Sequence, residues 1–220
     1  MGSIVVTGAN RGIGLELCTQ LKARGADVIA VCRTSSPELD ALGVRVEAGI
    51  DVADAAAASE LAKRLAGVDI DTLINNAGIL RGESLDGMNF ESVAQQLEVN
   101  AIAPLRVTAA LLPLLHKGSK VVITTSRMGS IADNGSGGYY GYRMSKAAVN
   151  AAGVSLAHDL KGRGIVVALI HPGMVATEMT GGHGIPTEES VRGYLARIDE
   201  ASLENTGRFW HATTGETLPW

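Results

Sequence analysis

The chain has 220 residues and a formal net charge of −4, and 46% of its residues are hydrophobic while 19% are charged. This composition is typical of a compact globular chain, and the length suits one large domain or two small ones. Because the small negative charge gives no general attraction to polyphosphate or anionic lipid, we expect no nucleic-acid partner and no membrane partner.

The only cysteines are Cys18 and Cys32, and no second Cys/His pair completes a tetrahedral zinc site. We therefore expect two small buried thiols, no disulfide framework and no metal. The first residues lack the basic region of a signal peptide, and no apolar run reaches the ~18 residues that a membrane-spanning helix needs. A cytoplasmic location is the expectation.

The chain alternates between short apolar runs and helical patterns. Ser3–Thr7 is an apolar run that stops at Gly8, and the helical stripe after it ends at Gly25. Further strands are predicted at 28–31, 44–48, 72–74, 120–125, 165–170 and 208–210, with helices at 53–66, 90–115 and 142–161. Apolar strands separated by helices predict an α/β fold whose parallel sheet is covered on both faces.

We count six strand–helix units and a terminal strand. The sequence contains no internal repeat and no linker, so one domain over residues 1–220 is expected. Two glycine-rich stretches, 134–138 and 181–184, follow predicted strands at the place where active-site loops of an open sheet belong.

A glycine-rich turn joins the first strand to the first helix. It reads T-G-x-x-x-G-x-G, with the residues Thr7, Gly8, Ala9, Asn10, Arg11, Gly12, Ile13 and Gly14. Missing side chains let the backbone turn sharply and let a diphosphate approach amides at a helix N-terminus. The position of the turn in a strand–turn–helix unit favours dinucleotide binding.

The second strand ends at Arg33, where an NAD enzyme would carry an acidic residue for the ribose 2′-hydroxyl. Arg33 offers a planar donor fork suited to a 2′-phosphate, and Arg11 can add a second cation. NADP (as NADPH) is therefore predicted in preference to NAD. The alternative is that Arg33 is a solvated charge at a strand end.

Tyr142 and Lys146 are four positions apart and share a face of the predicted helix. A lysine cation beside a phenol favours the phenolate, so we expect Lys146 to lower the tyrosine pKa toward a value useful for acid–base chemistry. The alternative is an exposed Tyr and Lys on one helix.

Four motifs occur in order along the chain: the glycine-rich turn, Asn75-Asn76-Ala77-Gly78, Tyr142-x-x-x-Lys146 and Pro172-Gly173-x-Val175-x-Thr177. Together they resemble the short-chain dehydrogenase/reductase family over essentially the whole chain. Within that family the sequence is similar to the compact C-factor and sniffer-like carbonyl reductases, through residues 126–130 and the ending 207–220.

The resemblance implies a Rossmann-type, doubly wound sheet of seven strands in the order 3-2-1-4-5-6-7, and a catalytic tetrad of Asn100, Ser126, Tyr142 and Lys146. Ser126 would hold the substrate carbonyl oxygen beside Tyr142. Asn100 would perturb its helix and hold a water that links Lys146 to solvent, and Lys146 would also bond the nicotinamide ribose. The implied cofactor contacts comprise Gly8, Asn10, Arg11, Gly12, Ile13, Gly14, Arg33, Asp51, Val52, Asn76, Ala77, Gly78, Asn100, Tyr142, Lys146, Pro172, Gly173, Val175 and Thr177.

Several positions leave alternatives open. Asp51 could instead be the N-cap of the following helix. Ser130 competes with Ser126 for the role of catalytic serine, because Ser126 precedes Tyr142 by more residues than is usual in the family. Tyr139 competes with Tyr142, because Arg143 follows it by four positions, although arginine is ill suited to a proton relay.

The function implied is NADPH-dependent reduction of a ketone or aldehyde, in either direction, with Tyr142 as general acid or base. The alternative is a non-catalytic NADP-binding regulatory or signalling protein. Leu80, Met128, Tyr139, Met174 and the 178–189 loop are expected to line a pocket for an apolar or aromatic carbonyl substrate. The helices at 103–115 and 147–156 are those that pair across subunits in the family, so we expect a homodimer or homotetramer.

Overall fold

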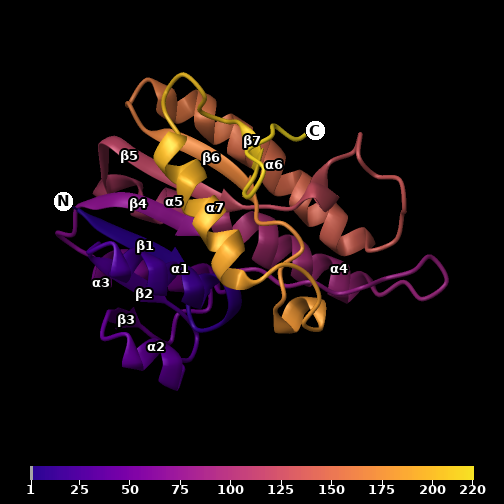
Figure 1. Cartoon of the computed structure of the whole chain (residues 1–220), viewed down its shortest axis with the longest axis horizontal. Helices are drawn as coiled ribbons and strands as arrows, with labels where there is room; N and C mark the ends of the chain where they lie inside the picture. The colour runs from indigo at the N-terminus through magenta and orange to yellow at the C-terminus, as the bar shows by residue number, and fades with distance from the viewer. Residues whose placement is uncertain (1) are drawn as a thin grey trace.

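The computed structural model describes residues 2–220, and it builds one sheet from seven parallel strands. The strand order is β3-β2-β1-β4-β5-β6-β7, which confirms the predicted doubly wound α/β fold (Figure 1). The strands are β1 (Ser3–Thr7), β2 (Val28–Val31), β3 (Arg45–Glu47), β4 (Ile70–Asn75), β5 (Leu115–Thr124), β6 (Val166–His171) and β7 (Phe209–His211).

Successive residues of the central strands enter two different cores, because side chains alternate across a sheet. Val5 of β1 packs into the core under α3 (Ala55–Arg64), α5 (Ala103–Leu111) and α6 (Tyr140–Lys161). Val6 packs into the core under α1 (Gly12–Ala23), α2 (Pro37–Ala41) and α7 (Thr187–Glu200). Both faces of the sheet are therefore covered, which explains why β1, β2 and β6 are almost continuously apolar.

The predicted helix over 90–115 forms as one nearly continuous helical stretch with a local change of pitch. It comprises α4 (Phe90–Leu97), a π-helical turn at Glu98–Ile102, α5 and a short 3-10 turn at Leu112–Leu114. By length and composition alone this stretch is apolar enough to cross a membrane, but core helices of soluble proteins meet the same test. Here its inner face packs into the core between the sheet and α3.

Predicted boundaries differ from the observed ones by a few residues where the capping was not foreseen. The helix expected at 53–66 begins at Ala55, because the Asp54 side chain accepts the Ala56 N–H and forms the N-cap. The Asx cap therefore belongs to Asp54, and the alternative that placed it at Asp51 is wrong. The region expected as a pocket loop at 178–189 holds a 3-10 turn, Glu178–Thr180, and the first residues of α7.

The loops that follow the strands gather at the end of the sheet opposite the N-terminus (Figure 1). They include the segments after β4, after β5 and after β6, and the glycine-rich turn after β1. Since β1 and β4 are neighbours although β2 and β3 separate them in sequence, the strand order reverses between them. This switch point is where open α/β sheets bind ligands.

Candidate active site

The glycine-rich turn after β1 has a shape that only glycine permits at two positions. Gly8 has a φ of +66°, and a Cβ there would lie 2.8 Å from the Ala77 Cα. A Cβ on Gly14 would lie 2.1 Å from the Gly8 carbonyl oxygen. The turn therefore packs α1 directly onto the ends of β1 and β4.

The N-terminus of α1 fits a diphosphate. Arg11 occupies the N-cap with extended backbone, and its side chain makes no capping bond to the first turn, which contains no acidic residue. The first amides of the helix thus remain available as donors, and the helix dipole favours an anion there. Gly12 and Ile13 begin the helix, so the predicted diphosphate contacts at 8–14 span the glycine-rich turn and the first turn of α1.

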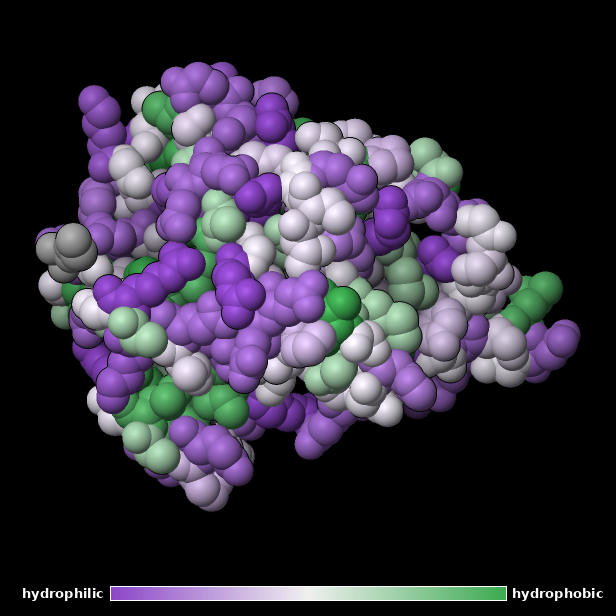
Figure 2. Space-filling model, viewed as in Figure 1, coloured by the Kyte–Doolittle hydropathy of each residue, from purple (hydrophilic) through white to green (hydrophobic). Residues whose placement is uncertain are grey.

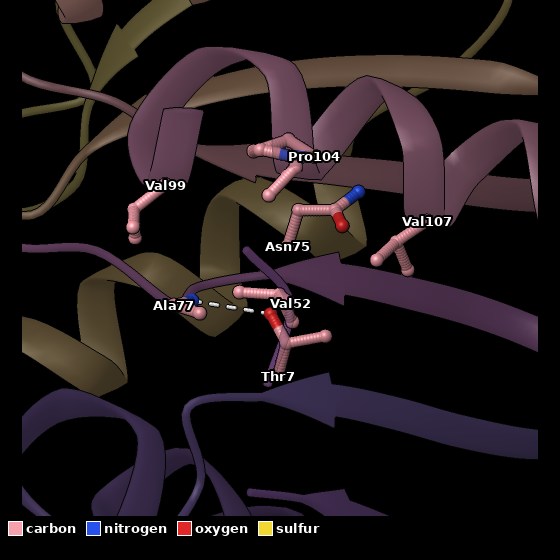
Figure 3. Close-up of a pocket in the computed structure, with 8 residues that line it drawn as sticks. Thr7, Val52, Asn75, Ala77, Val99, Pro104 and Val107 are labelled. Carbon is pink, nitrogen blue, oxygen red and sulfur yellow. Dashed lines mark hydrogen bonds between the residues drawn. The ribbon is translucent and has the colours of Figure 1, made fainter. Parts of the chain in front are cut away.

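Thr7 joins the turn to the end of β4. Its Oγ1 accepts the Asn76 N–H at 3.0 Å and the Ala77 N–H at 3.1 Å, and the latter bond is drawn in Figure 3. The Asn76 side-chain amide donates to the Thr7 carbonyl at 3.0 Å. A narrow space beside these groups is lined by Val52, Ala77 and residues of α5 (Figure 3). The predicted adenosine contacts Val52 and 76–78 therefore lie together.

Arg33 follows β2 and is exposed, with 69% of its side-chain surface accessible. Its Nη1 lies 3.9 Å from Asp51 Oδ2, a weak solvent-exposed pair that leaves the guanidinium accessible to a phosphate. Asp51 accepts the Ala53 N–H at 3.0 Å, which fixes its carboxylate at the same edge. An NADP 2′-phosphate thus fits Arg33, with one carboxylate close by.

The second predicted cation, Arg11, is engaged elsewhere. Its guanidinium forms an ion pair with Glu178, and both side chains are mostly exposed. The same segment brings the Thr177 methyl carbon to 3.4 Å from where a Gly12 Cβ would be. The segment after β6, with Val175 buried and Thr177 half-buried, therefore rests on the glycine-rich turn.

Tyr142 and Lys146 are both buried on the inner face of α6, so the alternative of an exposed pair is wrong. Lys146 Nζ lies 5.7 Å from the centre of the Tyr142 ring and donates to the Thr124 carbonyl at 2.9 Å. Ser126 follows β5, is buried, and places its hydroxyl beside the Tyr142 side chain. Three of the four tetrad residues, Ser126, Tyr142 and Lys146, therefore lie together where β5 ends and α6 begins.

Burial dominates the acid–base properties of this pair. It raises the pKa of Tyr142, and the hydrogen bond from Ser126 opposes that rise. It also lowers the pKa of Lys146 from 10.5 to about 8. The expectation of a lowered tyrosine pKa is therefore wrong for the chain alone, because loss of hydration around the phenol outweighs the opposing hydrogen bond from Ser126.

Asn100 lies in the π-helical turn, as expected for a residue that perturbs its helix. Its Oδ1 accepts the Ile79 N–H at 2.8 Å, and its Nδ2 donates to the Ile79 carbonyl at 2.8 Å and to Ser145 Oγ at 3.0 Å. A Cβ on Gly78 would approach both the Asn100 Oδ1, at 3.2 Å, and Lys146 Nζ, at 3.7 Å. Asn100 thus holds the segment after β4 close to Lys146.

The competing residues lie in different surroundings. Ser130 is buried and its Oγ accepts the Asp133 N–H at 3.1 Å, so it stabilises the loop after Ser126. Tyr139 is 43% exposed and has a φ of +52°. Arg143, its partner in the alternative, bonds the carbonyls of 137 and 138 and so braces the glycine-rich loop.

The remaining polar groups near the site do not resemble a metal centre. Within residues 2–220 no three Cys, His, Asp or Glu side chains are grouped to hold a metal ion. His171, which precedes Pro172 and Gly173 at the end of β6, packs edge-on against His211 with ring centres 5.0 Å apart. Burial lowers the pKa of His171 to about 3, so its ring is neutral at neutral pH.

Several supporting residues carried no motif in the sequence. The Thr124 carbonyl accepts a hydrogen bond from the Lys146 ammonium, and Ser145 Oγ accepts one from the Asn100 side-chain amide. Glu178 meets Arg11, and Glu83 bonds the backbone at the start of α6. The alternation of hydrophobic residues could have indicated that Thr124 ends a strand, but no local pattern indicates the partners of Glu83.

Known proteins resemble this chain over most of its length. The profile of the short chain dehydrogenase family matches residues 3–185. The 1-hydroxy-2-glutathionyl-2-methyl-3-butene dehydrogenase of Rhodococcus sp. (strain AD45) is 41% identical over 227 residues, covering 100% of both chains. Among solved structures, the NADPH-bound carbonyl reductase from chicken fatty liver is 30% identical with a TM-score of 0.88, covering 100% of this chain and 99% of that chain.

The carbonyl reductase Sniffer of D. melanogaster has a TM-score of 0.91 at 27% identity and covers 100% of both chains. These matches confirm the predicted resemblance, the enzyme class and NADP(H) as cofactor, and they agree with the free amides of α1 and the accessible Arg33. The chain belongs to the short-chain dehydrogenase/reductase family and is an NADP(H)-dependent oxidoreductase of the carbonyl-reductase-like kind.

Proposed function

We propose that the chain reduces a ketone or aldehyde to an alcohol with NADPH, and that Tyr142 supplies the proton. The observation that carries this proposal is the buried phenol of Tyr142, which lies beside Ser126 and close to the buried Lys146. Burial raises the pKa of that phenol, so it stays protonated at neutral pH and suits the role of proton donor.

In the proposed reaction, bound NADPH supplies a hydride, which carries two electrons to the carbonyl carbon. Ser126 donates a hydrogen bond to the carbonyl oxygen, whose negative charge grows as the C=O π bond breaks. Tyr142 transfers its proton to that oxygen, and Lys146 stabilises the phenolate that remains. Because the site is buried, this attraction is stronger than it would be in water.

Replacing the tyrosine hydroxyl alone tests this assignment. Tyr142→Phe keeps the ring and its packing, so NADPH should bind with unchanged affinity while turnover falls by at least ~100-fold, the smallest contribution usual for a general acid. Tyr139→Phe removes the hydroxyl of the competing, exposed tyrosine and should leave turnover within twofold of wild type. Normal turnover of Tyr142→Phe, or loss in Tyr139→Phe, would contradict the mechanism.

We also propose that the substrate is an apolar or aromatic carbonyl compound. Apolar side chains are exposed on the segments beside the site: Tyr139 at 43%, Met174 at 62% and Met179 at 46%. Exposed apolar groups next to a functional site favour an apolar ligand. Since the relative from Rhodococcus is named for an alcohol that bears a glutathionyl group, a panel of aliphatic and aromatic carbonyls should include an α-thioether aldehyde. Turnover confined to small hydrophilic aldehydes would contradict this substrate class.

A homodimer or homotetramer through α5 and α6 is proposed as well. Ile102, the last residue of the π-helical turn, is 46% exposed, and Leu105 of α5 is 44% exposed, on the layer that α5 shares with α6. The opposite face, over α1 and α7, is largely hydrophilic (Figure 2). An apolar pair on one layer and a hydrophilic surface on the other favour self-association through the α5 and α6 layer.

A further inference from the structure

Glu83 is a buried carboxylate outside the tetrad. It lies in the segment between β4 and α4 and is 6% exposed. Its Oε1 accepts hydrogen bonds from Ser92 Oγ and from Gln96 Nε2, both at 2.6 Å. Within residues 2–220 it takes part in no ion pair. Burying a charge in this way is costly unless strong hydrogen bonds compensate.

The hydrogen-bond directions around this carboxylate are fixed by its neighbours. Gln96 Oε1 accepts the Arg81 N–H at 2.9 Å, so the amide nitrogen of Gln96 must be the atom that faces Glu83. Glu83 Oε2 accepts the backbone N–H of Gly141 at 3.1 Å. Two fixed N–H donors and one hydroxyl therefore converge on the carboxylate, which an acceptor-only, ionised group satisfies best.

The helix that Glu83 contacts has no cap of its own. At the start of α6, Tyr139 adopts a left-handed conformation with φ of +52°, and its side chain makes no capping bond. The first turn also contains no acidic residue. Since Gly141 is the second residue of α6, its N–H is one of the orphan donors that an N-cap side chain normally satisfies. Glu83 supplies that acceptor from another part of the chain.

Two further contacts hold the start of α6 close to Glu83. The Glu83 carbonyl accepts the Tyr139 N–H at 3.0 Å, so the backbone and the side chain of Glu83 bind two amides that lie two positions apart at the start of α6. A Cβ on Gly141 would lie 2.6 Å from Gln96 Nε2 and 2.9 Å from the Val93 Cα. The first turn of α6 is thus pressed against α4, and glycine is required for this approach.

We propose that Glu83 is a positioning residue that caps α6 from a distance and so fixes the turn that carries Tyr142. Tyr142 directly follows Gly141, so fraying of the first turn would displace the phenol from Ser126. The effect of Glu83 on turnover rests on the proposed function of Tyr142. Its effect on the order of the helix does not.

The test is Glu83→Gln, with Glu91→Gln on exposed α4 surface as the matched control. Glutamine keeps the size but must turn its NH2 group toward an N–H or O–H donor, so at least one of the three bonds is lost. We expect kcat to fall about tenfold, because small misplacements of catalytic groups are costly. The dissociation constant of NADPH should stay within twofold, and hydrogen exchange should accelerate in peptides covering 139–146 only. Glu91→Gln should match wild type in all three.

Unchanged kcat and unchanged exchange at 139–146 in Glu83→Gln would overturn the proposal. So would exchange that accelerates equally across the whole sheet, or a kcat loss that merely tracks the fraction of protein binding NADPH. If Glu83→Gln does not fold, Ser92→Ala removes one donor, and local acceleration of exchange at 139–146 is again the result required. Tyr142→Phe keeps the two proposals separate: if it retains turnover, the mechanism fails while the exchange result still decides the capping role.

Discussion

Lys146 is expected to destabilise the folded protein at neutral pH. The residue is 4% exposed, and burial lowers the pKa of its ammonium from 10.5 to about 8. Each tenfold change in proton affinity is worth about 1.4 kcal/mol, so keeping the charge in the folded state costs about 3 kcal/mol. Replacing Lys146 by methionine, which has a similar shape, removes this cost.

The pH dependence of this cost has a definite sign. Below about pH 8 the lysine is charged in both states, and the full penalty acts on the folded state. As the pH rises from 8 to 10.5, the folded chain releases the proton while the unfolded chain keeps it, so the penalty shrinks. Wild type should therefore gain stability relative to Lys146→Met across this window.

Urea unfolding at pH 7 and pH 10.5, followed by tryptophan fluorescence, measures this gain. The free energy of unfolding of Lys146→Met minus that of wild type should fall by roughly 2–3 kcal/mol between the two pH values. The bond from Nζ to the Thr124 carbonyl is lost at both pH values, so its loss contributes mainly a constant offset. Lys161→Met, an exposed change at the far end of α6, should give a flat difference.

A difference for Lys146→Met that stays constant within about 0.5 kcal/mol would refute the reasoning, because the pH dependence follows directly from the linkage between proton binding and folding. Equal m values for the two proteins are required for the comparison, since a change in m signals a different unfolded or folded state. Turnover, in contrast, should be lost in Lys146→Met at every pH.

Three other predictions concern the cofactor, the catalytic serine and the assembly. Arg33→Gln should raise the dissociation constant of NADPH about tenfold and leave that of NADH within twofold, since a charge-assisted hydrogen bond is worth about 1.5–3 kcal/mol. An equal loss of affinity for both nucleotides, or a loss of NADPH affinity in the exposed control Arg163→Gln, would contradict this prediction. Ser126→Ala should lower kcat by ~100-fold, as expected for a donor to a developing oxyanion, whereas Ser130→Ala should stay within a few-fold; the reverse order would assign the role to Ser130. Leu105→Glu should convert the oligomer to monomer in sedimentation velocity, and a monomeric wild type would exclude the assembly.

Local patterns sufficed for much of the fold. The strands β1 and β2 and the helix that carries Tyr142 and Lys146 could be predicted because their periodicity lies within a few residues. The helix α7 was not located, although Pro186 precedes it and Val191, Tyr194 and Ile198 form a helical stripe that is buried in the structure. This pattern could therefore have predicted the helix from the sequence alone. The five-residue helix α2 is too short for periodicity, but Ser36 followed by proline is a typical start.

Long-range contacts set the limit for the site. Glu83 bonds Gly141 across 58 positions of the chain, and nothing next to Glu83 in the sequence indicates that contact. The ion pair of Arg11 with Glu178 could not be predicted for the same reason, although a phosphate contact was expected for Arg11. The two residues meet only when the segment after β6 folds onto the glycine-rich turn. The error about the Tyr142 pKa differs in kind: the spacing of Tyr142 and Lys146 was right, but spacing contains no information about burial.

That burial links the two halves of the proposed mechanism. A phenol that is buried keeps its proton until the substrate oxygen gains charge, and only then does transfer leave a phenolate beside Lys146 in a site with little water. The ammonium helps most at that stage, because its attraction acts on a charge that exists after the proton has moved. With a pKa of about 8, Lys146 is still mostly charged at neutral pH, so its cost to the folded state and its value to catalysis have one cause. In the proposed mechanism, the buried Lys146 therefore lowers the stability of the folded protein and stabilises the transition state more than the resting enzyme.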